Sequence, residues 1–192
     1  ITKDADPAIA LQIVERSSEF PGINAQPTSV RYYPGTLGAT GAHVLGYIGA
    51  LTDSDLAKDG GSKYYRSESI GKDGLEYQYD SYLRGRPGIK TVIVDRKESV
   101  TQKAKNTAPV PGMHLVTSLD VRIQGAAEAG LETAVKSARA QGYRADGGAA
   151  IVMDVNSGRV LAMASYPTYD PNIWEKGLTV TQAKDMYSAS TF

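Results

Sequence analysis

The sequence predicts an α+β fold in which an irregular first part precedes a regular helix and a β-hairpin. Three observations support this. Apolar residues recur at helical spacing after Asp120, a suitable N-cap. Two apolar runs flank Asn156-Ser157-Gly158, a loop that suits a hairpin with glycine in the left-handed region. Pro111-Gly112 is a turn signal that separates the irregular part from the regular part.

Composition excludes several classes of function. Lys and Arg total 21, as do Asp and Glu, so the formal net charge is zero and no nucleic-acid partner is predicted. There is no cysteine, which excludes disulfides, thiol nucleophiles and thiolate metal sites. His43 and His114, the two histidines, lack the spacing of a zinc or Ser-His-Asp site, and no metal or organic cofactor is predicted. No apolar run approaches the roughly 20 residues of a membrane span, and we expect no signal peptide.

The first part of the chain holds short elements. Asp6-Pro7 predicts a helix start, with Gly22 beyond its end. A strand is expected over Thr28 to Tyr33, followed by a region that is mostly loop, with one ordered element near Val44 to Ile48. The four-residue spacing within Gly71 to Gly88 predicts a helix along one face, marked by Leu75, Tyr79 and Leu83.

The second part is more regular. We expect a strand over Lys90 to Asp95 and an exposed strand or loop over Val100 to Pro109. A strand is predicted at His114 to Ser118, before the helix that ends near Gly142, and a weak helix near Thr181 to Ser188. The helix carries an apolar stripe, which consists of Ile123, Ala127, Leu131 and Val135. The near-continuous apolar first strand of the hairpin suggests burial on both faces.

Three segments, in order, resemble class B penicillin-binding proteins. RYYPGTLGATGAHVLGYIG, at residues 31–49, is similar to a motif of the family's membrane-proximal domain. GKDGLEYQYDSYLRGRPG, at 71–88, looks like the family's Gly-x-x-Gly-Leu-Glu, Tyr-Asp and Leu-Arg-Gly run. PGMHLVTSLDVRIQ and GGAAIVMDVNSGRVLAMASYPTYDPN resemble the entry into the transpeptidase domain. The positions that carry the resemblance, all interpreted as structural motif residues, are Arg31, Tyr33, Pro34, His43, Gly46, Gly71, Gly74, Leu75, Glu76, Tyr79, Asp80, Leu83, Arg84, Gly85, Gly88, Asp120, Gln124, Asp154, Gly158, Asp170, Pro171 and Asn172.

The resemblance implies an architecture and a parent activity. Residues 1–112 would form an elongated pedestal, or dimerisation, domain, and residues 113–192 the truncated N-terminal part of the transpeptidase domain. The parent would cross-link peptidoglycan stem peptides by D,D-transpeptidation through a β-lactam-sensitive acyl-serine. It would be anchored by one N-terminal helix at the extracytoplasmic face of the bacterial cytoplasmic membrane. Its implied partners are a polytopic glycan-polymerising membrane protein and cell-elongation or division scaffold proteins, with self-association also possible.

The chain itself lacks the family's catalytic set. Lys-Thr-Gly and Ser-x-Asn are absent, and the internal Ser-x-x-Lys at Ser69 to Lys72 is interpreted as chance. Ser190-Thr191-Phe192 resembles the start of Ser-Thr-Phe-Lys, without its lysine. It is a remnant of the motif, a junction or a coincidence. In each case we expect no catalytic residue here, because a serine without its lysine is not an activated nucleophile.

Single polar residues are given structural interpretations. Lys72, Glu76, Asp80 and Arg84 follow one another at four-residue spacing, which predicts a charge ladder along one helix. Arg84 and Arg31 are each expected to brace the pedestal through a buried or half-buried salt bridge. Three further interpretations are a hydrogen-bonded packing role for His43, an Asx-turn for Asp170 and a hairpin-turn role for Asp154.

The tyrosine content, the hairpin and the function each allow two interpretations. The 12 tyrosines, against two phenylalanines, suit equally a wet interaction surface or an irregular domain with a thin core. We expect a partner surface between Tyr32 and Tyr82. The hairpin is predicted to pack on the helix after Asp120 or to pair with another molecule. The alternative function is a free-standing extracytoplasmic module that binds glycan or protein and has no catalytic parent.

Overall fold

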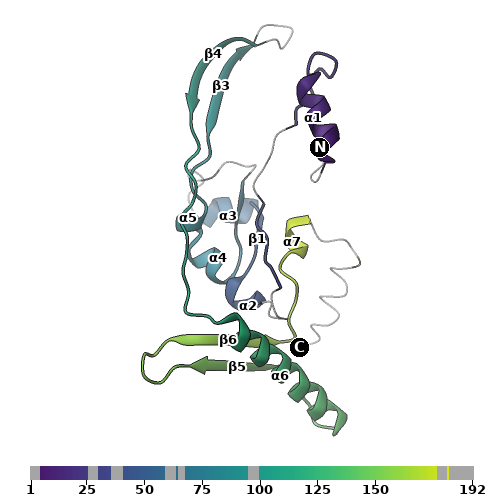
Figure 1. Cartoon of the computed structure of the whole chain (residues 1–192), viewed down its shortest axis with the longest axis vertical. Coiled ribbons are helices and arrows are strands. Elements are labelled where there is room, and N and C mark those ends of the chain that lie inside the picture. The colour runs from purple at the N-terminus through teal and green to yellow at the C-terminus, as the bar shows by residue number, and fades with distance from the viewer. Residues whose placement is uncertain are drawn as a thin grey trace.

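In the computed structural model the molecule is elongated, and the order of the elements along it differs from their order in the chain (Figure 1). The structure describes residues 5–25, 30–35, 41–58, 64, 68–94, 100–176 and 181. A two-stranded arm stands at one end, a central unit of short helices and strands lies in the middle, and a helix with a hairpin crosses the other end (Figure 1). Each of the three sheets among the described residues has two antiparallel strands. The predicted α+β fold is confirmed.

The first helix, α1 (Pro7–Glu15), begins as predicted. The Asp6 carboxylate accepts a hydrogen bond from the Ala8 N–H at 2.7 Å, and proline occupies the first turn. None of its residues is buried, and Ile9, Leu11 and Val14 are more than half exposed. The strand expected at Thr28 to Tyr33 is wrong for residues 30–33, whose main chain joins no sheet. Thr28 and Ser29 lie outside the described residues.

The central unit comprises residues 30–35, 41–58 and 68–88. It contains α2 (Ala42–Leu45), β1 (Ile48–Ala50), α3 (Asp53–Lys58), β2 (Ser69–Gly71), α4 (Gly74–Gln78) and α5 (Asp80–Leu83). Strands β1 and β2 pair in register from Ile48–Gly71 to Ala50–Ser69. The ordered element expected near Val44 to Ile48 is present as α2 and β1. Helix α3 was not predicted, although Thr52 and Asp55 carry a capping signal: the Asp55 carboxylate accepts from the Thr52 N–H at 2.8 Å.

The helix predicted through Leu75, Tyr79 and Leu83 is wrong as a single element. It breaks at Tyr79, whose φ of −112° and ψ of 20° are not helical. The Tyr79 N–H closes the end of α4 on the carbonyl of Leu75. The Asp80 carboxylate then accepts a hydrogen bond at 3.0 Å from the N–H of Gly71 in β2. Asp80, the first residue of α5, is thus bound to strand β2.

The arm consists of β3 (Ile89–Val94) and β4 (Val100–Thr107), paired antiparallel with two register shifts. It confirms the predicted strand at Lys90 to Asp95 as far as Val94, and residues 100–107 form a strand rather than a loop. The arm extends away from the central unit (Figure 1). Its base is closed by reciprocal main-chain hydrogen bonds between Arg86 and Val110, at 2.8 and 2.9 Å.

The hairpin unit comprises α6 (Val121–Ala140), β5 (Gly148–Met153) and β6 (Val160–Tyr166). The helix and hairpin were predicted with nearly these bounds, and the hairpin packs on α6, which is the first of the two expected arrangements. Val135 of α6 and Ala162 and Ala164 of β6 form the buried contact. Gly148 faces the helix too, since a Cβ there would lie 2.9 Å from Leu131 Cδ1.

Two predictions for this unit are wrong. Burial of β5 on both faces is contradicted by Ile151 and Met153, which are 63% and 52% exposed. Helix α6 covers one face of the hairpin, and no second layer among the described residues covers the other. The strand at His114 to Ser118 is absent: the linker (residues 113–120) joins no sheet, and touches β6 through Ser118 and Asp120.

After β6 the return segment (residues 167–176) includes α7 (Ile173–Lys176) and runs back beside β1 (Figure 1). The helix expected near Thr181 to Ser188 lies outside the described residues apart from Thr181. Within the described part of the chain, no helix is long and apolar enough to cross a bilayer.

Candidate functional site

The return segment contacts the central unit through the side chain of Asn172. Its Nδ2 donates to the Tyr33 carbonyl at 2.8 Å, and its Oδ1 accepts from the Tyr33 N–H at 2.8 Å. An amide side chain presents a donor and an acceptor side by side, so it pairs with a main chain as a neighbouring strand would. The predicted Asx-turn is confirmed, since the Asp170 carboxylate accepts from the Asn172 N–H at 2.9 Å.

Aromatic rings add to this contact. Tyr47 and Trp174 stack with centroids 4.2 Å apart and an interplanar angle of 12°. The Tyr169 hydroxyl donates to the Ala42 carbonyl at 3.3 Å. Burial, with the nearby negative charge of Asp73, raises the pKa of Tyr169 to about 12. His43 makes an edge contact with the Tyr169 ring, at 5.1 Å between centroids, but the residue is exposed, so the predicted packing role is seen only in part.

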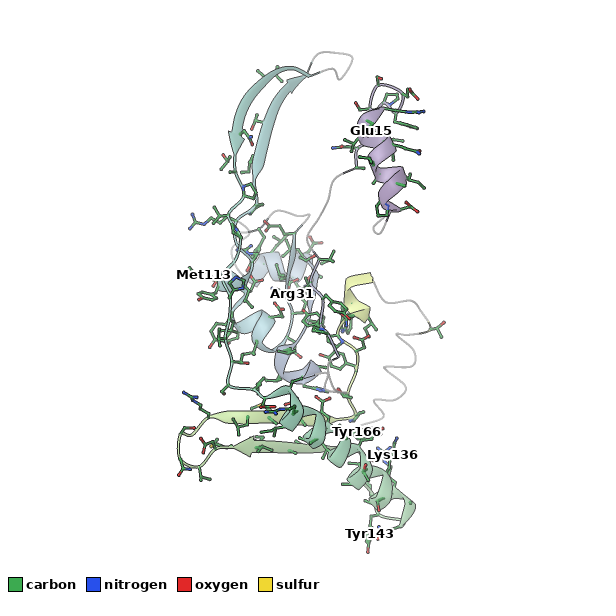
Figure 2. All side chains as sticks on the ribbon, viewed as in Figure 1. Glu15, Arg31, Met113, Lys136, Tyr143 and Tyr166 are labelled. Atoms are coloured by element: carbon green, nitrogen blue, oxygen red, sulfur yellow. The ribbon has the colours of Figure 1, made fainter. Side chains whose placement is uncertain are left out.

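Beneath this contact, Glu76 is the buried acceptor of a small network. Its carboxylate lies 2.8 Å from Arg31 Nε and 3.2 Å from the Tyr33 hydroxyl, and the residue is 8% exposed. Burial and the negative charge of Glu76 raise the pKa of Tyr33 well above its ordinary value. The salt bridge predicted for Arg31 is therefore present. Side chains gather around labelled Arg31 in the central unit (Figure 2).

A second network surrounds Arg84. Its guanidinium lies 3.2 Å from Glu68 and 3.6 Å from Asp80, and it sits 4.2 Å above the ring of Tyr64. The side chains of Arg84 and Glu68 are 22% and 14% exposed, so the predicted half-buried salt bridge of Arg84 is present. This network holds β2 against α5.

The predicted charge ladder is wrong. Asp80 and Arg84 form an ion pair at the four-residue spacing, but Lys72 pairs with Asp55 of α3, and Glu76 pairs with Arg31. The ladder needs one continuous helix, whereas Lys72 precedes α4 and the chain breaks at Tyr79. Asp55 has a pKa below its ordinary range, chiefly through its hydrogen bond with Lys72.

Gln124 and Glu128 connect α6 to β6 and to the central unit. The Gln124 side-chain amide donates to the Met163 carbonyl at 3.0 Å and accepts from the Met163 N–H at 2.8 Å. The amide therefore occupies the outer edge of β6. Glu128 accepts from Gln124 Nε2 and from the Gly41 N–H, both at 2.8 Å. Glu128 was not predicted. The sequence signal was a polar pair, four residues apart, beside the apolar stripe of α6.

Turn and cap residues have the expected roles. The Asp120 carboxylate caps α6 on the Arg122 N–H at 2.8 Å. The Arg122 guanidinium and N–H lower the pKa of Asp120 to about 2. Asp154 accepts from the Asn156 N–H at 3.0 Å, and its pKa is lowered, first by the Ser157 hydroxyl. Gly158 closes the loop with φ of 70°.

Glycines allow close backbone contacts between α2 and α4. A Cβ on Gly46, whose φ is 76°, would lie 1.8 Å from the Asp73 carbonyl oxygen. A Cβ on Gly74, whose φ is 57°, would lie 2.6 Å from the Val44 oxygen. Side chains at either position therefore cannot be accommodated without movement of the backbone. Among the other predicted glycines, Gly71, Gly85 and Gly88 also lie against neighbouring atoms, whereas a Cβ on Gly158 would meet nothing within 4 Å.

The remaining predicted motif residues are placed as follows. Leu75 and Leu83 are half-buried, Pro171 is buried, and Pro34 and Tyr79 are exposed. The described residues hold no group of three or more His, Cys, Asp or Glu that could bind a metal ion. Ser190-Thr191-Phe192 lies outside the described residues. The structure thus brings together Arg31, Tyr33, Glu76 and Asn172, while Asp120, Asp154 and Gly158 serve local turns and caps.

Comparison with known proteins agrees with this arrangement. The family model of the penicillin-binding protein dimerisation domain matches residues 1–117. The chain is 33% identical over 174 residues to the peptidoglycan D,D-transpeptidase MrdA of Escherichia coli K12, covering 88% of this chain and 25% of that protein. It is 32% identical over 154 residues to the peptidoglycan D,D-transpeptidase FtsI of the same strain, covering 80% of this chain and 22% of that protein.

A solved structure is similar over nearly the whole chain. It is the complex between penicillin-binding protein PBP2 and MreC from Helicobacter pylori, with a TM-score of 0.64 and 29% identity, covering 97% of this chain and 32% of that chain. The chain thus spans about a quarter of the length of the curated relatives that it matches. It belongs to the penicillin-binding protein dimerisation domain family of the MrdA and FtsI type.

Proposed function

We propose that this chain is the non-catalytic pedestal and interaction region of a longer peptidoglycan D,D-transpeptidase. The observation that carries the proposal is that its similarity to MrdA covers 88% of this chain and 25% of that protein. The parent would form an acyl-serine with a stem peptide or a β-lactam. The described residues support a structural role, since their polar networks join elements to one another and Lys72 is engaged by Asp55.

The proposed division places the pedestal domain at residues 1–112 and the start of the transpeptidase domain at 113–192. The family match over residues 1–117 supports a boundary in this region. The structure supports it as well: the arm is closed at its base by the Arg86–Val110 bridge, and the linker, residues 113–120, then leads to the hairpin unit.

The proposed location is the extracytoplasmic face of the cytoplasmic membrane, with the parent anchored by an N-terminal helix. The proposed partners are a polytopic glycan-polymerising protein and an elongation or division scaffold protein. The likeness to PBP2 in its complex with MreC supports the scaffold partner. The elongated arrangement suits a spacer that holds a catalytic domain at a distance and exposes its sides to partners (Figure 1).

A labelled-penicillin assay tests the proposal. The chain of residues 1–192 and the product of the complete gene are each incubated with a fluorescent penicillin, with and without excess unlabelled penicillin. We expect a covalent adduct on the complete product alone, because acylation needs an activated serine. A competable adduct on the 192-residue chain would overturn the non-catalytic role. A complete gene that ends near residue 192, or a complete product without an adduct, would instead support the free-standing binding module.

A further inference from the structure

We propose that Asn172 and Glu128 together form a latch that sets the orientation of the hairpin unit against the central unit. Asn172 binds both main-chain groups of Tyr33, 139 positions away along the chain. Glu128 binds the main-chain N–H of Gly41, 87 positions away. Both side chains follow the linker and both partners precede it, so the latch joins the residues after the linker to the central unit independently of the linker.

The linker itself is a weak constraint on orientation. Residues 113–120 contain neither helix nor strand. The Met113 N–H bonds to Tyr82 at 3.0 Å at one end, and Ser118 and Asp120 bond to β6 at the other. Met113, the first residue of the linker, is labelled at the edge of the central unit in Figure 2. Between these two anchored ends, no helical or sheet hydrogen bonds fix the main chain of the linker. The orientation therefore depends on the contacts that bypass the linker.

Neighbouring residues hold the Asn172 side chain in the orientation that binds Tyr33. The Asp170 carboxylate accepts from both the main-chain N–H and the Nδ2 of Asn172, at 2.9 and 2.8 Å. These two bonds hold the amide in the orientation that Tyr33 requires, so little rotamer freedom is lost on contact. On the other side, the Tyr33 hydroxyl is bound by Glu76, which is paired with Arg31. The contact thus joins two segments that are each already ordered.

The Glu128 half uses a buried carboxylate. Glu128 is 8% exposed, and its Oε1 accepts from Gln124 Nε2 as well as from Gly41. A buried carboxylate that loses a donor incurs a large desolvation cost, so separation of Gly41 from α6 is disfavoured. Gly41 has φ of 55°, which suits glycine and points its N–H toward α6. The Tyr47–Trp174 stack then covers the return segment beside β1.

The latch is tested in the 192-residue chain by a distance measurement between the units. The chain has no cysteine, so spin labels are placed through Ser81→Cys in α5 and Ala134→Cys in α6, both exposed. We expect one narrow distance distribution in this labelled chain. It should broaden when Asn172→Ala and Glu128→Ala are combined. The matched control is Asn156→Ala, an exposed residue of the hairpin loop.

Two further readouts separate loss of the latch from loss of the fold. Trp174 is the single tryptophan, so its emission should shift to the red when the return segment leaves Tyr47. Hydrogen exchange at the Tyr33 N–H should accelerate by about tenfold or more in Asn172→Ala, because the half-buried hydrogen bond of this N–H is lost. Amides within α6 should keep their protection.

Asn172→Asp is the sharper variant, since it keeps the acceptor for the Tyr33 N–H and replaces the donor to the Tyr33 carbonyl with an oxygen. We expect it to behave as Asn172→Ala does. An unchanged distance distribution with unchanged exchange at Tyr33 would overturn the latch. So would an equal loss of protection at Tyr33 and throughout α6, since that pattern means global unfolding.

Discussion

Glu76 shows how much one buried acceptor stabilises in a molecule with a thin core. The fully or nearly buried residues of the described chain are few and mostly small, and Glu76 is one of three polar residues among them. Its carboxylate serves Arg31 and the Tyr33 hydroxyl at once. Removal of the Glu76 carboxylate would leave the Tyr33 hydroxyl without that acceptor inside the protein. This loss should lower the free energy of unfolding more than removal of a solvated ion pair does.

We therefore expect Glu76→Ala to lower the free energy of unfolding by about 2 kcal/mol, measured by urea denaturation. Glu76→Gln should cost less, because its amide oxygen still accepts from Tyr33. The matched control is Glu132→Ala, which removes the exposed i,i+4 pair with Lys136 on α6. That change should have little effect, since exposed pairs contribute little. Equal losses in Glu76→Ala and Glu132→Ala would contradict the role given to Glu76.

At the scale of elements, the central unit depends on backbones that approach within van der Waals contact. Helix α4 lies against α2 because Gly46 and Gly74 carry no side chain there. Helix α6 is different: Gly130 lies on its exposed side, where a Cβ would meet nothing within 4 Å. Replacement of glycine by alanine should therefore destabilise the chain at Gly46 and stabilise it at Gly130.

Gly46→Ala is expected to destabilise the chain by more than about 2 kcal/mol, because the Cβ would overlap the Asp73 carbonyl at positive φ. Gly130→Ala should stabilise it by about 0.5–1 kcal/mol through helix propensity. Thermal and urea unfolding of the two variants beside the parent chain measures both. A tolerated Gly46→Ala would mean that α2 and α4 separate easily, and would contradict this account of the central unit.

For the whole molecule, the elongated shape leaves a large exposed side on the central unit. Tyr79, between α4 and α5, and Tyr82, in α5, are 41% and 43% exposed. Exposed tyrosine is enriched in protein interfaces because it combines a large apolar ring with a hydroxyl. Tyr47 is different, since it stacks on Trp174 within the fold. The proposed partner surface is therefore placed on α4 and α5, rather than over all of Tyr32 to Tyr82.

We predict that Tyr79→Ala combined with Tyr82→Ala weakens binding to an MreC-type scaffold protein of the same organism by about tenfold or more. Binding is measured by calorimetry with the purified 192-residue chain. The control is Tyr143→Ala, because Tyr143 is 67% exposed at the far end of α6 (Figure 2). Affinity that is unchanged in the double variant, with the fold retained, would remove this surface from consideration.

Residues close together in the sequence were sufficient to predict where several elements begin or turn. Asp6-Pro7 and Asp120 predicted the starts of α1 and α6, and Gly158 predicted the hairpin loop. These features depend on residues within a few positions of one another, so their physics is contained in a short window of sequence. The Asx-turn of Asp170 belongs to the same class.

Features that depend on distant segments could not be predicted this way. The break at Tyr79 accompanies a hydrogen bond from β2 to Asp80, and the pairing of Lys72 with Asp55 replaced the expected ladder. The exposure of β5 depends on which layers cover the hairpin, a fact that apolar composition does not contain.

The sequence by itself determined the fold class, the main helix and hairpin, and the family resemblance that comparison then confirmed. Only the tertiary structure decided that Asn172 holds Tyr33 and that Glu128 holds Gly41. The physical reason is that each of these contacts joins a side chain to a main-chain group. Main-chain groups are the same at nearly every residue, so no residue pattern marks the partner, and only folding brings the two together.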